Sequence, residues 1–157
     1  RYFCLMHCFR LSKKKYDNHL SGIGAFRYGG RWNTAGTYIV YASSSRALAM
    51  AEVYVHISHN MIPDDMVMVT IDIPDNIRIP VLETDNLPQG WNDIHDKNLV
   101  NQIGNQFVKE SKYLAIYVPS AVVKDDLNLL INPNHCDFNQ ITIKEVLPFK
   151  IDDRMFN

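Results

Sequence analysis

The pattern of apolar and polar residues along the chain predicts more strands than helices. Three stretches are rich in β-branched and aromatic side chains, as buried strands usually are: TYIVYA (37–42), MVMVTIDI (66–73) and YLAIYVP (113–119). Two weaker apolar runs, at 127–132 and 140–148, predict two further strands. A chain with this many short strands needs at least one sheet at its core.

Two segments have the features of helices. Ser43, Ser44 and Ser45 offer N-cap hydroxyls ahead of an Ala-rich stretch, which continues without a breaker to about His59. Polar and apolar residues alternate at a helical spacing over 96–110. Because no strand–helix–strand rhythm repeats, we expect a mixed α+β fold rather than a doubly wound parallel sheet.

Glycine is concentrated in one segment, SGIGAFRYGGRWNTAG (21–36), which holds five of the seven glycines in the chain. We therefore expect a loop or a series of turns there. Arg31 directly follows Gly29 and Gly30, where two residues without side chains let the backbone approach a ligand closely. An arginine beside a turn is more often an ordinary surface residue, but this context makes Arg31 a candidate phosphate-binding group.

The length and the net charge of the chain indicate how many domains to expect and which ligands to exclude. The 157 residues contain no internal repeat and no Pro/Gly-rich linker, so we expect one domain over 1–157. The formal net charge of -1 argues against direct binding of nucleic acid, which usually requires a strongly basic surface. No stretch approaches 18 apolar residues, and we expect a cytoplasmic protein that does not contact a membrane.

Cysteine spacing gives little support to a metal site or a disulfide framework. The three cysteines, Cys4, Cys8 and Cys136, form no C-x-x-C pair. Ligand sets can be imagined from Cys4, His7 and Cys8, or from His135 and Cys136, but their spacings match no familiar zinc site. We therefore expect reduced cysteines and no bound metal.

Three other residues are candidates for chemistry. Tyr41 ends the strand predicted at 37–42, where its ring could project into a cleft, although a tyrosine in a strand is more often part of the core. On a helical wheel Glu52 lies at the edge of the apolar stripe, so we expect it to be partly desolvated and to face the sheet. Ser120 follows a predicted strand, where a hydroxyl either binds a ligand or, more commonly, caps a turn.

Taken together, these segments resemble the RES domain, the toxin half of a bacterial toxin–antitoxin pair, named for its arginine, glutamate and serine. The resemblance runs from about residue 8 to 145. It is carried, in order, by CFRLSKKK, SGIGAFRYGGRWNTAG, YIVYASSSRALAMAEVYVHI, LPQGW and YVPSAVVKDDLNLLINPNHCDF. The most specific signal is GGRWN followed by a YAS-x-S-x-x-LA-x-x-E helix. Phe107 departs from the tryptophan of many relatives, which we expect to affect packing alone.

The resemblance implies a fold like that of ADP-ribosyltransferases, a split β-sheet flanked by helices, with a cleft for NAD. It also implies that the enzyme degrades NAD by hydrolysis or phosphorolysis of the nicotinamide–ribose bond. NAD would be a substrate, inorganic phosphate an optional co-substrate, and no cofactor or metal would be needed. The implied catalytic residues are Arg31, Tyr41 and Glu52, and the implied NAD-binding residues are Arg31, Trp32, Tyr41, Ser43, Ser120 and Asn128.

The residue types agree with this reaction. A cationic pyridinium leaves with little acid assistance, whereas the ribose that it leaves develops oxocarbenium-like positive charge. One carboxylate, that of Glu52, is enough to stabilise such a charge.

Two other functions stay open at this point. The same cleft could transfer ADP-ribose to a protein side chain, or the domain could be a catalytically silent binding module. The intact Arg31, Tyr41 and Glu52 argue against the silent module. The resemblance further implies an Xre-like helix-turn-helix antitoxin as partner, with a segment that covers the cleft, and it leaves open whether the chain forms a homodimer.

Overall fold

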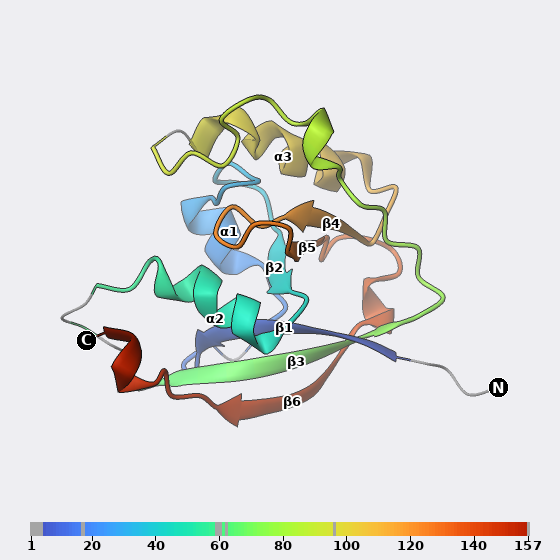
Figure 1. Ribbon diagram of the computed structural model, residues 1–157. Helices are drawn as coiled ribbons and strands as arrows, with labels where there is room; N and C mark the ends of the chain where they lie inside the picture. Colours follow the sequence, from blue (N-terminus) through green and yellow to red (C-terminus); the bar gives the residue numbers. More distant parts are fainter. Residues whose placement is uncertain (1–4, 17, 59–60, 62, 96, 157) are drawn as a thin grey trace.

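The computed structural model describes residues 5–16, 18–58, 61, 63–95 and 97–156. Within these residues six strands form one sheet in the order β4-β5-β2-β1-β3-β6, and each neighbouring pair is antiparallel. The strands are β1 (Leu5–Lys13), β2 (Val40–Ser43), β3 (Met66–Pro74), β4 (Ala115–Pro119), β5 (Leu127–Ile131) and β6 (Thr142–Pro148). The α-helices are α1 (Ile23–Tyr28), α2 (Arg46–Tyr54) and α3 (Asn101–Glu110) (Figure 1). The predicted α+β class is confirmed.

The sheet is nearly divided between β1 and β2. β1 and β3 share nine residue pairs, whereas β1 and β2 share only the pair Phe9–Ser43. In Figure 1, β1, β3 and β6 run across the bottom of the molecule, and β2, β4 and β5 stand above them. Buried side chains from both groups meet in one hydrophobic core, which includes Cys8, Val40, Val69, Ile71, Leu129 and Ile131. The sheet is therefore split into two halves that pack against each other, as the prediction had it.

Each half carries its own helix. α2 begins at Ser45, whose side chain accepts a hydrogen bond from the Leu48 N–H at 3.0 Å, and it packs through Ala49 on Phe9 and Leu11 of β1. α3 packs on the other half through a cluster that contains Trp32, Ile39, Trp91, Val100, Phe107, Val118 and Leu130. None of the helices in the described ranges is long and apolar enough to cross a membrane.

The glycine-rich segment contains a helix that the prediction of a loop over 21–36 missed. Gly22, with φ 71°, precedes the first turn of α1, and Gly29, with φ 69°, ends the helix. These glycines supply left-handed conformations at the two ends and leave the residues between them free to be helical. The glycine content therefore marked the ends of a short helix rather than the absence of one.

Three other elements differ from the prediction. β1 was not predicted, because His7, Arg10 and the following lysines interrupt its apolar pattern. α2 ends at Tyr54 rather than near His59, which lies outside the described residues. α3 begins at Asn101 rather than at position 96, which also lies outside them, and a short 3-10 turn at Lys97–Leu99 precedes it.

Close packing of α3 fixes the position of the segment that contains Arg31. A Cβ atom on Gly104 would lie 1.9 Å from the carbonyl oxygen of Trp32. The helix can approach this carbonyl only because position 104 has no side chain. Since Trp32 directly follows Arg31, Gly104 sets how far the arginine segment stands from α3.

Replacing Gly104 with alanine is expected to lower the free energy of unfolding by about 1–3 kcal/mol, because backbone must move to admit the methyl group. This loss occurs despite the better helix propensity of alanine. Gly24→Ala is the matched control: it also lies inside a helix, and its Cβ meets nothing within 4 Å. Urea denaturation measures both variants, and equal stability of the two would contradict this account.

Candidate active site

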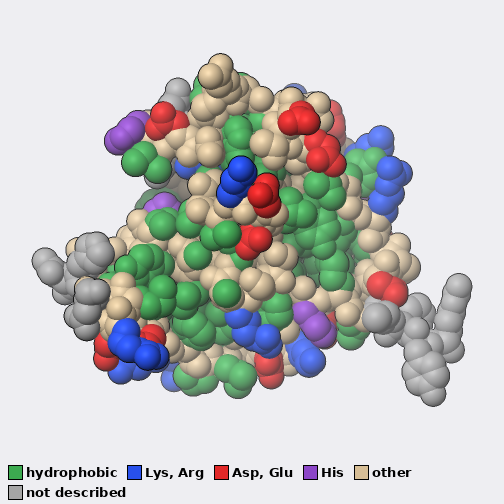
Figure 2. Space-filling model, in the orientation of Figure 1, with side chains coloured by type: hydrophobic (Ala, Val, Ile, Leu, Met, Phe, Trp, Pro, Cys, Tyr) green, Lys and Arg blue, Asp and Glu red, His purple; other side chains and the backbone are tan. Residues whose placement is uncertain are grey.

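A cleft of about 890 Å³ lies where the two halves of the sheet separate. Its walls come from β1, the glycine-rich segment, β2, α2 and β5, and Figure 2 shows the surface hollowed on the side where α2 faces the upper part of the molecule. Six of the seven residues that the sequence singled out line this cleft: Arg31, Trp32, Tyr41, Ser43, Glu52 and Asn128. The seventh, Ser120, reaches the cleft through its bond to Glu52.

Two donors from the opposite half of the sheet hold the carboxylate of Glu52. Ser120 Oγ and Asn128 Nδ2 both donate to Glu52 Oε1, each at 2.6 Å. Neither donor carries a charge, and within the described residues Glu52 makes no ion pair. Its second oxygen, Oε2, has no hydrogen-bond partner in the same part of the chain. No cationic side chain therefore neutralises the half-buried carboxylate among the described residues, and one of its oxygens is available to a ligand.

Both donors are themselves held in place. Ser43 Oγ donates to Asn128 Oδ1 at 2.7 Å, which turns the amide so that its NH₂ group faces the carboxylate. Ser120 Oγ accepts from the backbone N–H groups of Val122 and Val123, at 3.1 and 3.0 Å, so its own proton is available for Glu52. Ser120 thus holds a turn, the more common of its two expected roles, and it also donates to Glu52. Ser43 orients Asn128, and Ser45 caps α2.

Tyr41 stabilises residues 30–33, the arginine segment that contains Arg31, through its hydroxyl. The hydroxyl donates to Asn33 Oδ1 at 2.5 Å and accepts from the backbone N–H of Trp32 at 3.2 Å. Burial raises the pKa of this hydroxyl well above its usual range. A Cβ on Gly30 would lie 2.7 Å from the hydroxyl oxygen, so the approach requires glycine at that position. The Tyr41 hydroxyl is therefore occupied within the protein, whereas the residue still lines the cleft.

Arg31 is anchored to a second segment of the chain. Its Nη1 donates to the backbone carbonyls of Trp91 and Asp93, at 2.9 and 3.2 Å. Trp91 packs against Trp32, whose side chain is only 3% exposed, with ring centroids 5.8 Å apart. One nitrogen of the guanidinium thus fixes the 91–93 loop, and the remaining donors can serve a ligand in the cleft.

Arg10 of β1 is a cleft residue that the sequence reasoning did not select. Its Nη1 donates to the backbone carbonyl of Tyr41 at 2.9 Å, and burial lowers the pKa of the guanidinium. Its Nε is shielded from solvent and has no hydrogen-bond partner among the described residues. The sequence offered one signal for Arg10, namely its place between two apolar residues, Phe9 and Leu11, which are both buried. An arginine is rarely buried without a partner, so such a position suggests a specific role.

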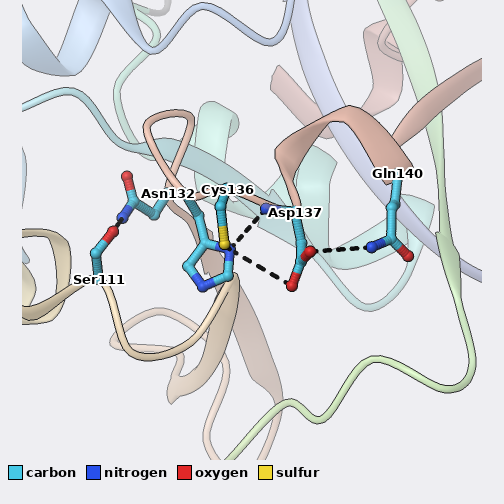
Figure 3. A network of polar contacts seen from close by, with 6 residues as sticks. Ser111, Asn132, Cys136, Asp137 and Gln140 are labelled. Atoms are coloured by element: carbon cyan, nitrogen blue, oxygen red, sulfur yellow. Dashed lines mark hydrogen bonds and ion pairs between the residues drawn. The ribbon is translucent and has the colours of Figure 1, made fainter.

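The imagined metal ligands do not converge on the cleft. Donor atoms of His135, Cys136 and Asp137 lie within 4.8 Å of one another in a turn after β5, where His135 Nδ1 accepts from the Asp137 backbone N–H at 3.0 Å. Figure 3 shows this turn and the neighbouring bond from Asn132 Nδ2 to Ser111 Oγ, 2.9 Å long. The bond from Asn132 joins the turn to the end of α3, and the bond from Asp137 to His135 holds the shape of the turn itself.

The two described residues of the imagined set near the start of the chain, His7 and Cys8, lie on opposite faces of β1. Cys8 lies in the core, where burial raises the pKa of its thiol to about 12. His7 faces the other side of the strand and bonds to Asp72 through its Nδ1. Cys4 lies outside the described residues.

Comparison with known proteins places the chain in a family. The model of the family described as RES domain matches residues 7–152. A relative named Toxin Res from Photorhabdus laumondii is 37% identical over 153 residues, which cover 96% of this chain and 97% of the relative. A protein named Prs ADP-ribosylating toxin from Sphingobium sp. is 39% identical over 138 residues, covering 87% and 86%.

The fold has a solved counterpart. A crystal structure of the MbcT–MbcA toxin–antitoxin complex of M. tuberculosis matches with a TM-score of 0.73 and 18% sequence identity. The match covers 98% of this chain and 88% of the other. At this identity the likeness shows that the two chains share a fold.

The role of the Tyr41 hydroxyl can be tested by its removal. Tyr41→Phe leaves the ring but deprives the Trp32 N–H of its acceptor, and we expect a loss of about 1–3 kcal/mol in the free energy of unfolding. Tyr28→Phe is the control, because Tyr28 is 83% exposed and its change should stay within about 0.5 kcal/mol. Thermal and urea unfolding compare the two variants. A Tyr41→Phe protein as stable as the parent would remove the structural role assigned to the hydroxyl.

Proposed function

The chain belongs to the RES domain family, and on that premise we propose that it is a toxin that destroys NAD by breaking the nicotinamide–ribose bond. The observation that carries the proposal is the carboxylate of Glu52. Its Oε1 is fixed by Ser120 and Asn128, and it has no cationic partner among the described residues. An ionised carboxylate with one open oxygen in a cleft suits a reaction that develops positive charge on a sugar.

Nicotinamide is a cationic leaving group, so it departs as a neutral molecule when it takes the bonding electron pair. The ribose then carries oxocarbenium-like charge at its anomeric carbon, and Glu52 stabilises that charge and binds a ribose hydroxyl through Oε2. Tyr41 orients the nicotinamide ring with the part of its side chain that lines the cleft. The fixed position of Glu52 means that no rearrangement is needed as the charge develops.

Two guanidiniums in the cleft suit the diphosphate of NAD. The Nε of Arg10 has no partner among the described residues, and Arg31 has donors beyond the nitrogen that holds the 91–93 loop. Arginine donors in a fixed fork match phosphate oxygens. In this proposal both arginines bind phosphate oxygens, Asn128 and Ser120 hold Glu52, and Ser43 and Trp32 act through the neighbours that they orient. Neither a cofactor nor a metal is part of this scheme, and phosphate can replace water as the acceptor.

Transfer of ADP-ribose to a protein is the second candidate. The name of the Sphingobium relative, Prs ADP-ribosylating toxin, favours it. The same cleft residues would act on the same bond, and only the acceptor would differ. A reaction that contains NAD and no target protein separates the two functions.

We further propose that an Xre-like antitoxin blocks the cleft. Three large apolar residues that line the cleft are exposed: Val55 at 52%, Ile94 at 72% and Val122 at 38%. Exposed apolar side chains grouped around a cleft are typical of a protein-binding surface. The net charge of -1 fits a division in which the antitoxin contacts DNA.

NAD cleavage is tested with the purified chain and NAD alone, by measurement of free nicotinamide. We expect release in large excess over enzyme and a loss of at least about a hundredfold in Glu52→Gln, since glutamine keeps the Oε1 acceptor but not the charge. Glu110→Gln, which changes an exposed carboxylate on α3, is the control. Nicotinamide release that requires a target protein would favour the transferase, and full activity of Glu52→Gln would contradict the role of the carboxylate.

The antitoxin proposal is tested by co-expression of the chain with the product of its neighbouring gene. We expect a stable complex that leaves NAD intact and that is weakened by Ile94→Asp, a change at an exposed residue of the cleft, but not by Ile143→Asp, a change at an exposed apolar residue of β6. Pull-down and nicotinamide release measure the two properties. A complex that degrades NAD as fast as the free chain would rule out a block of the cleft.

A further inference from the structure

The cleft contains an ionisable side chain that the proposed function leaves unused. His56 follows α2 and lines the cleft together with Glu52, four residues before it. The backbone N–H of His56 donates to the carbonyl of Val53 at 3.0 Å, so the chain continues its helical turn through this residue. Both side chains line the same cleft, and the imidazole lies in the turn that directly follows the helix of the carboxylate.

His56 is the group in the cleft best suited to accept a proton. The other titratable or charged residues that line the cleft are Arg10 of β1, Arg31 of the glycine-rich segment, Tyr41 of β2 and Glu52 of α2. Guanidiniums donate hydrogen bonds and do not accept protons at neutral pH, and the Tyr41 hydroxyl is already bonded to Asn33 and Trp32. His56 is exposed to the cleft, and the part of the chain that the structure describes gives its imidazole no hydrogen bond or ion pair.

Glu52 cannot perform both tasks at once. A carboxylate that stabilises an oxocarbenium-like ribose must stay ionised while the positive charge develops. If it took a proton from the acceptor at that stage, it would lose the charge on which the stabilisation depends. A neutral imidazole can take this proton instead, because one of its ring nitrogens is an acceptor.

We propose that His56 is a second catalytic residue of this cleft and acts as general base toward the acceptor; this inference rests on the proposed cleavage of NAD. The acceptor water attacks the anomeric carbon of the ribose, and a new C–O bond forms as the bond to nicotinamide breaks. The bonding electron pair leaves with the nicotinamide nitrogen, which becomes neutral. The proton of the water passes to His56 and then to solvent, so that NAD⁺ and water yield nicotinamide, ADP-ribose and one proton.

The test compares an acceptor that must lose a proton with one that carries none. ADP-ribose and nicotinamide are measured for the wild type, His56→Gln and Glu52→Gln, with NAD alone and with NAD plus sodium azide. Azide is an anion at neutral pH and needs no base. His95→Gln is the matched control, since His95 is an exposed histidine that does not line the cleft.

We expect His56→Gln to form ADP-ribose at least tenfold more slowly than the wild type. Azide should restore its nicotinamide release to within a few fold of the wild type, with azido-ADP-ribose as product. Glu52→Gln should stay inactive with both acceptors, and His95→Gln should match the wild type. This pattern would show that His56 acts as a base on the acceptor, whereas Glu52 is needed to break the bond to nicotinamide.

Three outcomes would overturn the assignment. ADP-ribose formation by His56→Gln within threefold of the wild type would show that no base acts at this position. A loss that azide does not restore would make His56 a residue for NAD binding or for the shape of the cleft. A wild-type chain that releases no nicotinamide from NAD alone would refute the proposed function itself, and the role of His56 with it.

Discussion

The structure depends on the hydrogen bonds of one carboxylate, that of Glu52, which connect the two halves of the sheet. Few backbone hydrogen bonds join these halves. α2 belongs to the half with β1, on which it packs, whereas Ser120 and Asn128 belong to the half with β4 and β5. In the part of the chain that the structure describes, Phe9 and Ser43 are the only residues paired between these halves. Arg10 makes a similar link, because it leaves β1 and donates to the carbonyl of Tyr41 on β2. The polar groups of the cleft are thus also cross-links of the fold.

Because both donors to Glu52 are neutral, the carboxylate can connect the two halves of the sheet and still act on a positively charged group. An arginine or lysine in place of Ser120 and Asn128 would bind Glu52 more strongly and also cancel its charge. A hydroxyl and an amide hold one oxygen at 2.6 Å and leave the charge in place. Each donor is oriented by a group behind it, the Ser43 hydroxyl in one case and two backbone N–H groups in the other. The arginine segment is likewise held by neutral groups, because the Tyr41 hydroxyl and the close approach of Gly104 fix its backbone.

The sequence predicted those parts of the fold that depend on local pattern. Buried strands such as β3 and β4 have continuous apolar runs, and the serines before α2 were correctly taken as its cap. β1 could not be found in this way, because Arg10 breaks its apolar pattern and is buried only when β2 supplies a carbonyl. α1 was missed because glycines at its ends were counted as breakers within it. Local context selected Arg31, Tyr41, Glu52 and Ser120 as candidates, and the resemblance to a family gave them roles and added Trp32, Ser43 and Asn128. The bonds among Ser43, Asn128 and Glu52 join distant segments that only folding brings together.

The Nε of Arg10, which has no acceptor among the described residues, shows how the cleft relates to the stability of the domain. A shielded N–H without an acceptor costs on the order of 1–3 kcal/mol, a large part of the net stability of a small domain. Nothing in the packing of β1 requires that donor, since the Nη1 bond to Tyr41 already holds the side chain. A phosphate oxygen that displaced the atoms shielding this N–H would recover the cost through a charge-assisted bond. The fold thus keeps a donor unsatisfied at the seam between its halves, and under the proposed function NAD would complete there the set of polar contacts that the chain alone leaves open.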